Sequence, residues 1–179
     1  YGGLMAIQTL WAGPWMTRVA GYTPLESATG LFSINITMLV SFFLWGYFLP
    51  KITDLGFSAL KILKIGLPIS FLVMLTIIVL GSKAGAFYIT LFILSSIFLS
   101  VIQPAVGLSF QSHLAGKALT SFNLLIFLGA FIMQWFIGFV IDLIKSLGYT
   151  EIIGFQTAFS VFLLLSLTSY MFFLVINKK

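Results

Sequence analysis

The sequence predicts an all-α membrane protein whose helices cross a bilayer several times. Of its 179 residues, 60% are hydrophobic and 7% are charged, which is too few ionic side chains to cover a water-soluble domain of this length. The polar residues gather in short islands between long runs of Leu, Ile, Val and Phe. Because hydrophobicity is continuous along these runs and does not alternate, they favour membrane helices over the strands of a β-barrel.

Polar or glycine-containing islands divide the chain into six apolar runs. The runs cover residues 2–16, 25–49, 62–82, 86–110, 119–143 and 152–176. A helix needs about 20 residues, at roughly 1.5 Å each, to cross about 30 Å of hydrocarbon. Five runs meet this length and the first falls short, and the chain opens on Tyr1 instead of a methionine. We therefore expect six membrane helices, the first of them truncated, in a fragment of a longer protein.

Turn and capping residues predict where the first two helices end or begin. Gly13 and Pro14 are expected to end the first helix. Thr23 is expected to cap the second, with Pro24 at its first helical position, where the missing N–H costs nothing. Pro50 is expected to interrupt the chain after the second helix.

Glycines predict the remaining turns. Gly56 precedes the third run, and Gly81 and Gly85 bracket a hairpin between the third and the fourth. Gly116 and Gly148 are expected to mark the turns before the fifth and the sixth. Loops this short make neighbouring helices antiparallel.

The basic residues predict the orientation of the bundle. One side of the membrane receives Lys51, Lys61, Lys64, Lys117, Lys178 and Lys179, and the other receives Arg18, Lys83 and Lys145. The first side is cytoplasmic by the positive-inside rule, so both ends of the chain face the cytoplasm. Topology and lipid headgroups account for the net charge of +5, which therefore does not indicate a nucleic-acid partner.

Polar and small side chains recur every three or four residues in four of the runs, which places them along one helical face in each. These stripes are Gln8, Trp11 or Ala12, and Trp15; Gly30, Ser33, Thr37 and Ser41; Ser96, Ser100, Gln103 and Gly107; and Asn123, Phe127, Ala130, Gln134, Gly138 and Asp142. Pro104 predicts a kink in the fourth run. The third run offers only Ser70 and Thr76 and predicts a lipid-facing support, while the polar residues of the sixth are scattered around its circumference.

Each stripe has two interpretations. Small and weakly polar faces let membrane helices approach closely, so the Gly, Ser and Thr positions favour packing. Gln103, Asn123 and Gln134 also fit the wall of a watery cavity, because an amide offers more hydrogen-bonding groups than a packing seam needs. Trp15, beside a loop, is expected to be an interfacial tryptophan. Asp142, near a run's end, is expected to reach the outer aqueous boundary.

Three segments carry a resemblance to a known family. They are "QTLWAGPW" (residues 8–15), the basic loop after "GYFLPK" (46–51) and the helix "FNLLIFLGAFIMQWFIGFVID" (122–142). With six helices whose ends both face the cytoplasm, they resemble the C-terminal half of a major facilitator superfamily transporter. The resemblance covers residues 1–179 as one half-domain, which corresponds to helices seven to twelve of twelve.

The sequence departs from that family's pattern in one loop. The family often has a glycine, an aspartate and a basic-glycine cluster between the second and third helices of each half. Here Gly46 is followed by Pro50 where the aspartate would fall, and Asp54, Gly56 and Lys61 make a degraded version.

The resemblance implies a six-helix bundle of two inverted three-helix repeats. The first, second, fourth and fifth helices would face a central cavity, with the third and sixth outside, and alternating access would move a small polar solute bound near the midplane. The residues expected to line this cavity are Gln8, Trp11, Thr37, Ser100, Gln103, Asn123 and Gln134. The partners implied are a small-molecule solute, the lipid bilayer and an N-terminal six-helix half, in a bacterial inner (plasma) membrane. No catalytic residue, cofactor or metal is implied.

The apolar runs have no central charged or histidine side chain, so they offer no proton relay and no charged anchor for a substrate. Any coupling to an ion is therefore expected in the other half or at the ends of the spans, and uniport is also allowed. Sugars, amino acids, organic acids and drugs suit the amides and tryptophans about equally.

Two other classes remain open. An intramembrane enzyme needs a nucleophile and a base, and the single histidine, His113, stands beside Ser112 with Lys117 close by, but no G-x-S-x-G elbow or metal-binding histidine pair accompanies it. An assembly or scaffold subunit would use the polar stripes to bind partner helices.

Overall fold

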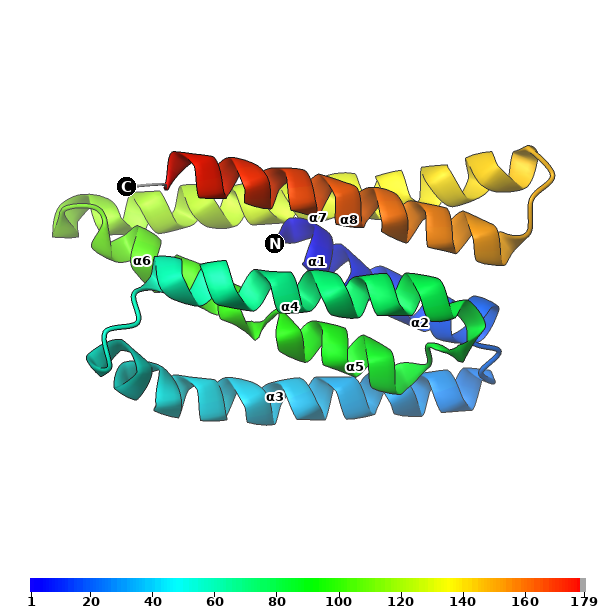
Figure 1. Cartoon of the computed structure of the whole chain (residues 1–179), viewed down its shortest axis with the longest axis horizontal. Helices are drawn as coiled ribbons and strands as arrows, with labels where there is room; N and C mark the ends of the chain where they lie inside the picture. Colours follow the sequence, from blue (N-terminus) through cyan, green and yellow to red (C-terminus); the bar gives the residue numbers. More distant parts are fainter. Residues whose placement is uncertain (178–179) are drawn as a thin grey trace.

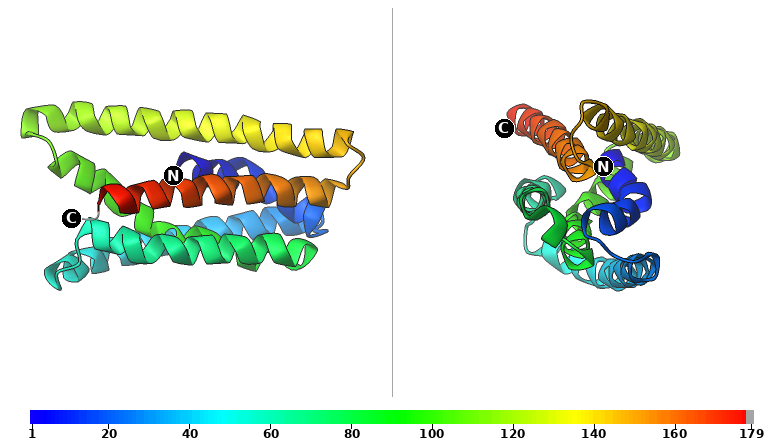
Figure 2. Two further views of the ribbon diagram at one scale, coloured as in Figure 1. Left: turned by 45° about the horizontal axis from the view of Figure 1, so that its top comes forward. Right: turned by 90° about the vertical axis from the view of Figure 1, so that its right-hand side faces the viewer.

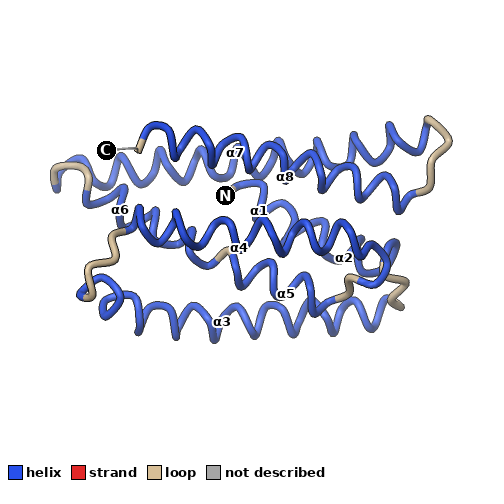
Figure 3. Tube along the Cα trace, in the orientation of Figure 1, coloured by secondary structure: helices blue, strands red, loops and turns tan. Residues whose placement is uncertain are grey.

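The computed structural model describes residues 1–177, which form helices joined by short turns (Figure 3). Six helical segments, called here the first to sixth spans, run back and forth along one axis (Figure 1). Within the described residues, five helices are long and apolar enough to cross a membrane, and the first span is not among them. The predicted all-α architecture, with five full-length candidate spans and a short first helix, is confirmed.

Two of the six spans are irregular. The second, third, fifth and sixth spans are α3 (Pro24–Asp54), α4 (Ala59–Leu80), α7 (Ser112–Ser146) and α8 (Glu151–Ile176). The first span consists of α1 (Gly2–Ala6), η1 (Ile7–Trp11), α2 (Ala12–Pro14) and η2 (Trp15–Val19). The fourth consists of α5 (Ala86–Ser95), η4 (Ile97–Val101) and α6 (Ile102–Leu108), and a short turn, η3 (Gly81–Lys83), precedes it.

Side-chain caps begin α3 and α8 where the sequence predicts helix starts. The Thr23 hydroxyl accepts from the Glu26 N–H at 3.2 Å, and the Glu26 carboxylate accepts from the Thr23 N–H at 2.8 Å. This reciprocal pair, with Pro24 at the first helical position, satisfies donors that the helix start leaves free. Thr150 caps α8 by accepting from the N–H of Ile153 at 3.4 Å.

The predicted end of the first span is wrong. Gly13 and Pro14 lie inside it, and the helical coil continues to Val19. The Thr17 hydroxyl donates to the carbonyl oxygens of Gly13 and Pro14, at 3.2 and 3.3 Å. The carbonyl that Pro14 leaves without its usual donor is that of Leu10, and the chain remains helical through the wider turns on either side of the proline.

Two further breaks expected from the sequence are also wrong. Pro50 lies in the last turns of α3, which continues to Asp54, and Gly116 lies within α7. Pro50 has no N–H to donate to the Gly46 carbonyl, but α3 continues beyond it, and the Thr53 hydroxyl donates to the Pro50 carbonyl at 2.6 Å. Gly56 and Gly148 do occupy turns, with φ of 85° and 87°, a region that glycine enters without strain.

Each span packs on at least two others. The second packs on the fourth, the fourth on the third, the third on the sixth, the sixth on the fifth and the fifth on the first, which also contacts the second and the sixth. An end view shows α3 and α7 on opposite sides of the bundle (Figure 2). The first residue lies at mid-length of its neighbours, and the described chain ends beside the turns that follow α3 and α6 (Figure 1).

Trp15 lies in the core and not at the lipid interface that the sequence suggested. Its side chain is fully buried. The indole stacks on Phe159 with ring centroids 4.8 Å apart and meets Phe155 edge-on at 6.1 Å. Its N–H donates to the carbonyl oxygen of Ala84 at 2.7 Å, so the polar end of the ring is satisfied in the turn before the fourth span.

The basic residues separate to the two ends of the bundle, as predicted. Arg18, Lys83 and Lys145 lie at or beside the turns of one end, called here the outer end, where Arg18 Nη1 and Lys145 Nζ lie 3.2 and 3.6 Å from the same Glu151 oxygen. The other end, called the inner end, has Lys51, Lys61, Lys64 and Lys117. Lys178 and Lys179, assigned to the same side, lie outside the described residues.

Candidate functional site

A cavity of about 240 Å³ lies between the first, second and fourth spans. Its polar lining residues are Tyr1, Gln8 and Thr9 at the start of the chain and in the first span, Ser41 of the second span, and Ser96 and Ser100 of the fourth. Met5, Met38 and several aliphatic and aromatic side chains supply the rest of the wall. The cavity is thus mostly apolar, with polar groups from three helices, as is typical of small-molecule sites.

The first span reaches this cavity through an irregular turn. Along Ile7–Trp11 the backbone bonds follow a five-residue step, and the Ala12 N–H donates to the carbonyl of Ile7. Wider turns of this kind are rare and are often found at functional sites. Pro14 has no N–H to offer the carbonyl four residues earlier, which is a cause for the irregularity at this point.

The fourth span is also broken beside the cavity. Ile97–Val101 is wound more tightly than an α-helix, and the Leu99 N–H donates to the Ser96 carbonyl, only three residues earlier, at 3.0 Å. Pro104 follows within the first turn of α6, and its ring excludes the usual bond to the carbonyl of Ser100. The predicted kink is therefore present, one turn before the proline itself.

Gln8 and Ser100 are the two predicted site residues that line this cavity. The Gln8 amide nitrogen lies 3.0 Å from the sulfur of Met38, which is a weak acceptor. The Ser100 hydroxyl oxygen is buried and has no hydrogen-bond partner within the described residues. Buried polar groups are rarely left unpaired, so both side chains retain capacity for a ligand or water.

Gln134 braces the irregular turn of the first span from the opposite side. Its amide nitrogen donates to the Thr9 hydroxyl at 3.2 Å, and its backbone carbonyl accepts from the Trp11 indole N–H at 3.2 Å. Trp11 also meets Phe155 edge-on at 5.9 Å. Trp11 is therefore a packing residue of the core, and it does not line the cavity.

Gln103 and Asn123 form a separate pair nearer the inner end. The Gln103 amide nitrogen donates to the Asn123 oxygen at 3.1 Å, which joins the fourth and fifth spans. Thr37, the last predicted site residue, is half-buried on α3, and its carbonyl accepts from the Ser41 hydroxyl. These three residues do not line the cavity, so the structure divides the predicted site into a cavity and two amide contacts.

Sequence reasoning missed Thr9, Met38 and Ser41. Thr9 and Met38 bind the predicted amides of Gln134 and Gln8, and Ser41 lines the cavity although it was noted only as part of a stripe. Thr9 comes directly after Gln8 in the "QTLWAGPW" segment. The orientation of its side chain depends on the wider turn Ile7–Trp11, which the residue types do not predict.

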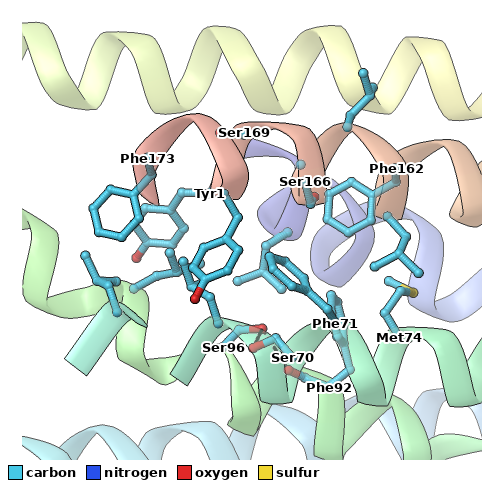
Figure 4. Close-up of a pocket in the computed structure, with 18 of the residues that line it drawn as sticks. Tyr1, Ser70, Phe71, Met74, Phe92, Ser96, Phe162, Ser166, Ser169 and Phe173 are labelled. Carbon is cyan, nitrogen blue, oxygen red and sulfur yellow. Dashed lines mark hydrogen bonds between the residues drawn. The ribbon is translucent and has the colours of Figure 1, made fainter. Parts of the chain in front are cut away.

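A larger cavity of about 370 Å³ lies on the other side of the first span (Figure 4). Residues of α4 and α8 line it, with Ser70 on α4 and Ser166 and Ser169 on α8, among mostly apolar neighbours. The expectation that the third span is a lipid-facing support therefore holds for one face only. Leu72 and Val79 are exposed on that face, whereas Met74 and Ile77 are buried on the other.

Other reactive groups are dispersed. No group of three or more metal-ligating side chains occurs among residues 1–177. Ser112 and His113 are exposed in the first turn of α7, and no hydrogen bond between them occurs in this part of the chain. Asp142 is exposed in the outer part of α7, consistent with contact with water at that boundary.

Among the described residues, no charged side chain lines either cavity. The geometry therefore favours binding through hydrogen bonds and apolar contact, and the titratable side chain that lines both cavities is the phenol of Tyr1. Comparisons with known protein families, with curated proteins and with solved structures find no match to this chain.

Proposed function

We propose that the chain forms one six-helix half of a secondary transporter of the major facilitator type and moves a small polar solute by alternating access. The observation that carries this proposal is the position of the two broken helices. The first and fourth spans each begin a group of three helices, and both are irregular where they border the same cavity. Interrupted helices at corresponding positions of two repeats are typical of transporter binding sites.

The packing of the spans also supports two inverted repeats. In an inverted-repeat arrangement the first, second and third spans correspond to the fourth, fifth and sixth. Two pairs of contacts then correspond: second–fourth with fifth–first, and third–fourth with sixth–first. The contact between the third and sixth spans corresponds to itself. The extensive contact of the fifth with the sixth has no counterpart of similar extent between the second and the third, so the relation is partial. A pseudo-two-fold relation is expected of inverted repeats.

A second six-helix half is the proposed partner. The second span fully buries only Ser27, Gly30 and Ile34; one face, including Met38 and Trp45, is half-buried against the bundle, and the opposite face is open. Exposed apolar stripes on it and on the fifth span comprise Phe32, Ile36, Leu39, Phe43 and Tyr47, and Leu124, Phe127, Leu128, Phe131 and Trp135. We propose that parts of both stripes pack on the other half, with the bundle in a plasma membrane and its inner end in the cytoplasm.

Uptake by proteoliposomes containing the intact protein tests this function. We expect Gln103→Leu, Asn123→Leu and Gln134→Leu each to lower the initial rate of solute uptake about tenfold, because each breaks a bond between spans, Gln103 to Asn123 or Gln134 to Thr9, that is worth about 1.4 kcal/mol and holds the walls of the transport path in place. Thr76→Val is the control, since Thr76 is exposed on α4 and bonds only to its own helix, at Leu72. Unaltered uptake in all three amide variants would contradict the proposal.

An assembly subunit is the second candidate. The observation that favours it is that the predicted site amides bind other parts of the chain, Gln103 to Asn123 and Gln134 to Thr9. Polar side chains join helices in this way within membranes. In that case the amide variants would weaken helix association, and the unmodified protein would transport nothing.

An intramembrane hydrolase remains the least supported alternative, because Ser112 and His113 are exposed at the inner end and not at membrane depth. Loss of a measured hydrolysis in the His113→Ala variant would revive this alternative, and unchanged hydrolysis would dispose of it.

A further inference from the structure

We infer that the cavity between the first, second and fourth spans binds an uncharged solute, one with a hydroxyl, amide or carbonyl group on a short apolar body. The inference rests on the proposed transport function and names its substrate class. It follows from the hydrogen-bonding state of Ser100 and Gln8, from the uncharged wall and from the size of the cavity.

Ser100 is held with its hydroxyl free by the break in its helix. In regular helical parts of this chain, serines such as Ser41 and Ser160 donate to the carbonyl four residues earlier, at Thr37 and Gln156, both at 2.7 Å. In the tighter turn around Ser100 that pattern is lost, and the Leu99 N–H occupies the Ser96 carbonyl. The Ser100 hydroxyl is therefore left to the cavity, where it can donate or accept.

Gln8 supplies the complementary group from the opposite wall. Its amide nitrogen has the Met38 thioether as its acceptor, and its amide oxygen accepts from no donor among residues 1–177. A ligand carbonyl or hydroxyl is a stronger acceptor than a thioether, so exchange of Met38 for a ligand gains a better hydrogen bond.

The rest of the wall opposes a charged ligand. The described lining contains no acidic, basic or histidine side chain, and Met5, Phe42 and Ile97 supply apolar contact. A charged group placed there without a counter-charge would lose its hydration and gain no partner. The volume of about 240 Å³ corresponds to about eight water molecules, which limits the bound part of the solute to a similar number of heavy atoms.

Protection of an introduced cysteine tests this specificity independently of transport. The chain has no cysteine, so Ser100→Cys gives it a single thiol in the cavity. The intact protein in lipid nanodiscs is alkylated with a small maleimide in the presence of pentanamide, pentanoate or pentylammonium, which match in shape and differ in charge. Ser109→Cys, on the same span but outside the cavity, is the control. Ser41→Cys, also in the cavity wall, replaces Ser100→Cys if that variant does not fold.

We expect pentanamide to slow alkylation in the cavity about tenfold at ten times its half-protecting concentration. Gln8→Leu should raise that half-protecting concentration about threefold to tenfold, since it removes one hydrogen bond. Pentanoate and pentylammonium should leave the rate unchanged, and no probe should affect Ser109→Cys. Protection by either charged probe, or by none of the three, would overturn the inference. The uptake assay would still report on transport, because its amide variants lie outside this cavity.

Discussion

Gln103 and Asn123 join the fourth and fifth spans through their side chains, with the Gln103 amide nitrogen 3.1 Å from the Asn123 oxygen. Hydrogen bonds between the side chains of neighbouring membrane helices contribute modestly to stability. Coupling energies from double-mutant cycles average about 0.6 kcal/mol and reach about 1.7 kcal/mol. We expect a double-mutant cycle with Gln103→Leu and Asn123→Leu to give a coupling in that range. Unfolding by SDS in mixed micelles measures it, and strictly additive effects would show that the two amides do not interact.

Trp15→Phe should lower the free energy of unfolding by about 1–3 kcal/mol. Phenylalanine keeps the stack on Phe159 but removes the donor from the Ala84 carbonyl, and a buried acceptor is then left unpaired. Trp45→Phe is the matched control, because the Trp45 indole also packs within the bundle, edge-on to Phe98, but its N–H has no hydrogen-bond partner among residues 1–177. The same unfolding measurement should leave the control unchanged, and equal effects of the two substitutions would contradict the buried role of Trp15.

Gly66→Ala should destabilise the contact of the third and fourth spans. An added Cβ at this buried glycine would overlap the ring and the Cβ of Phe98, and overpacking of this kind costs about 1–3 kcal/mol. Gly46→Ala is the control, since nothing lies within 4 Å of that position in α3. Thermal unfolding in detergent should show a lower midpoint for Gly66→Ala alone, and a midpoint equal to that of the control would rule out the close approach.

Glu151→Gln should have a small effect that salt removes. Glu151 pairs with both Arg18 and Lys145, but these side chains are partly exposed, so the loss should stay below about 1 kcal/mol. The difference should disappear near 1 M salt, where the Debye length is about 3 Å. Lys83→Gln, at the same end, serves as the control. A loss that persists at high salt would indicate a buried role for Glu151.

The positions of the helices follow from hydrophobicity and caps, and the irregular turns do not. The five long spans begin within a few residues of their predicted starts except α7, which begins at Ser112 and includes Gly116. Pro14 likewise stays within the first span, with a wider turn on either side of it. Local changes of helix winding of this kind depend on the packing of neighbouring side chains, which a pattern of residue types does not specify.

The site was predictable in its residue types but not in its grouping. The stripes led us to expect Gln103, Asn123 and Gln134 in the wall of a cavity, whereas in the structure Gln103 meets Asn123 and Gln134 meets Thr9. The stripes also gave no indication that Gln8 and Ser100 would be the only two of the seven predicted site residues to line this cavity. That grouping follows from two helix breaks that rotate the faces of the first and fourth spans.

Single-cysteine accessibility tests most directly the claim that the first and fourth spans wall a water-filled site. Cysteine is placed at Gln8 or Ser100 in the cavity, and at Leu72 or Val79 on the exposed face of α4. A hydrophilic maleimide, which requires a hydrated thiol, is then applied to the protein in nanodiscs. We predict modification at positions 8 and 100 and none at 72 and 79, which face lipid. Modification of the α4 positions with protection of both cavity positions would contradict the account.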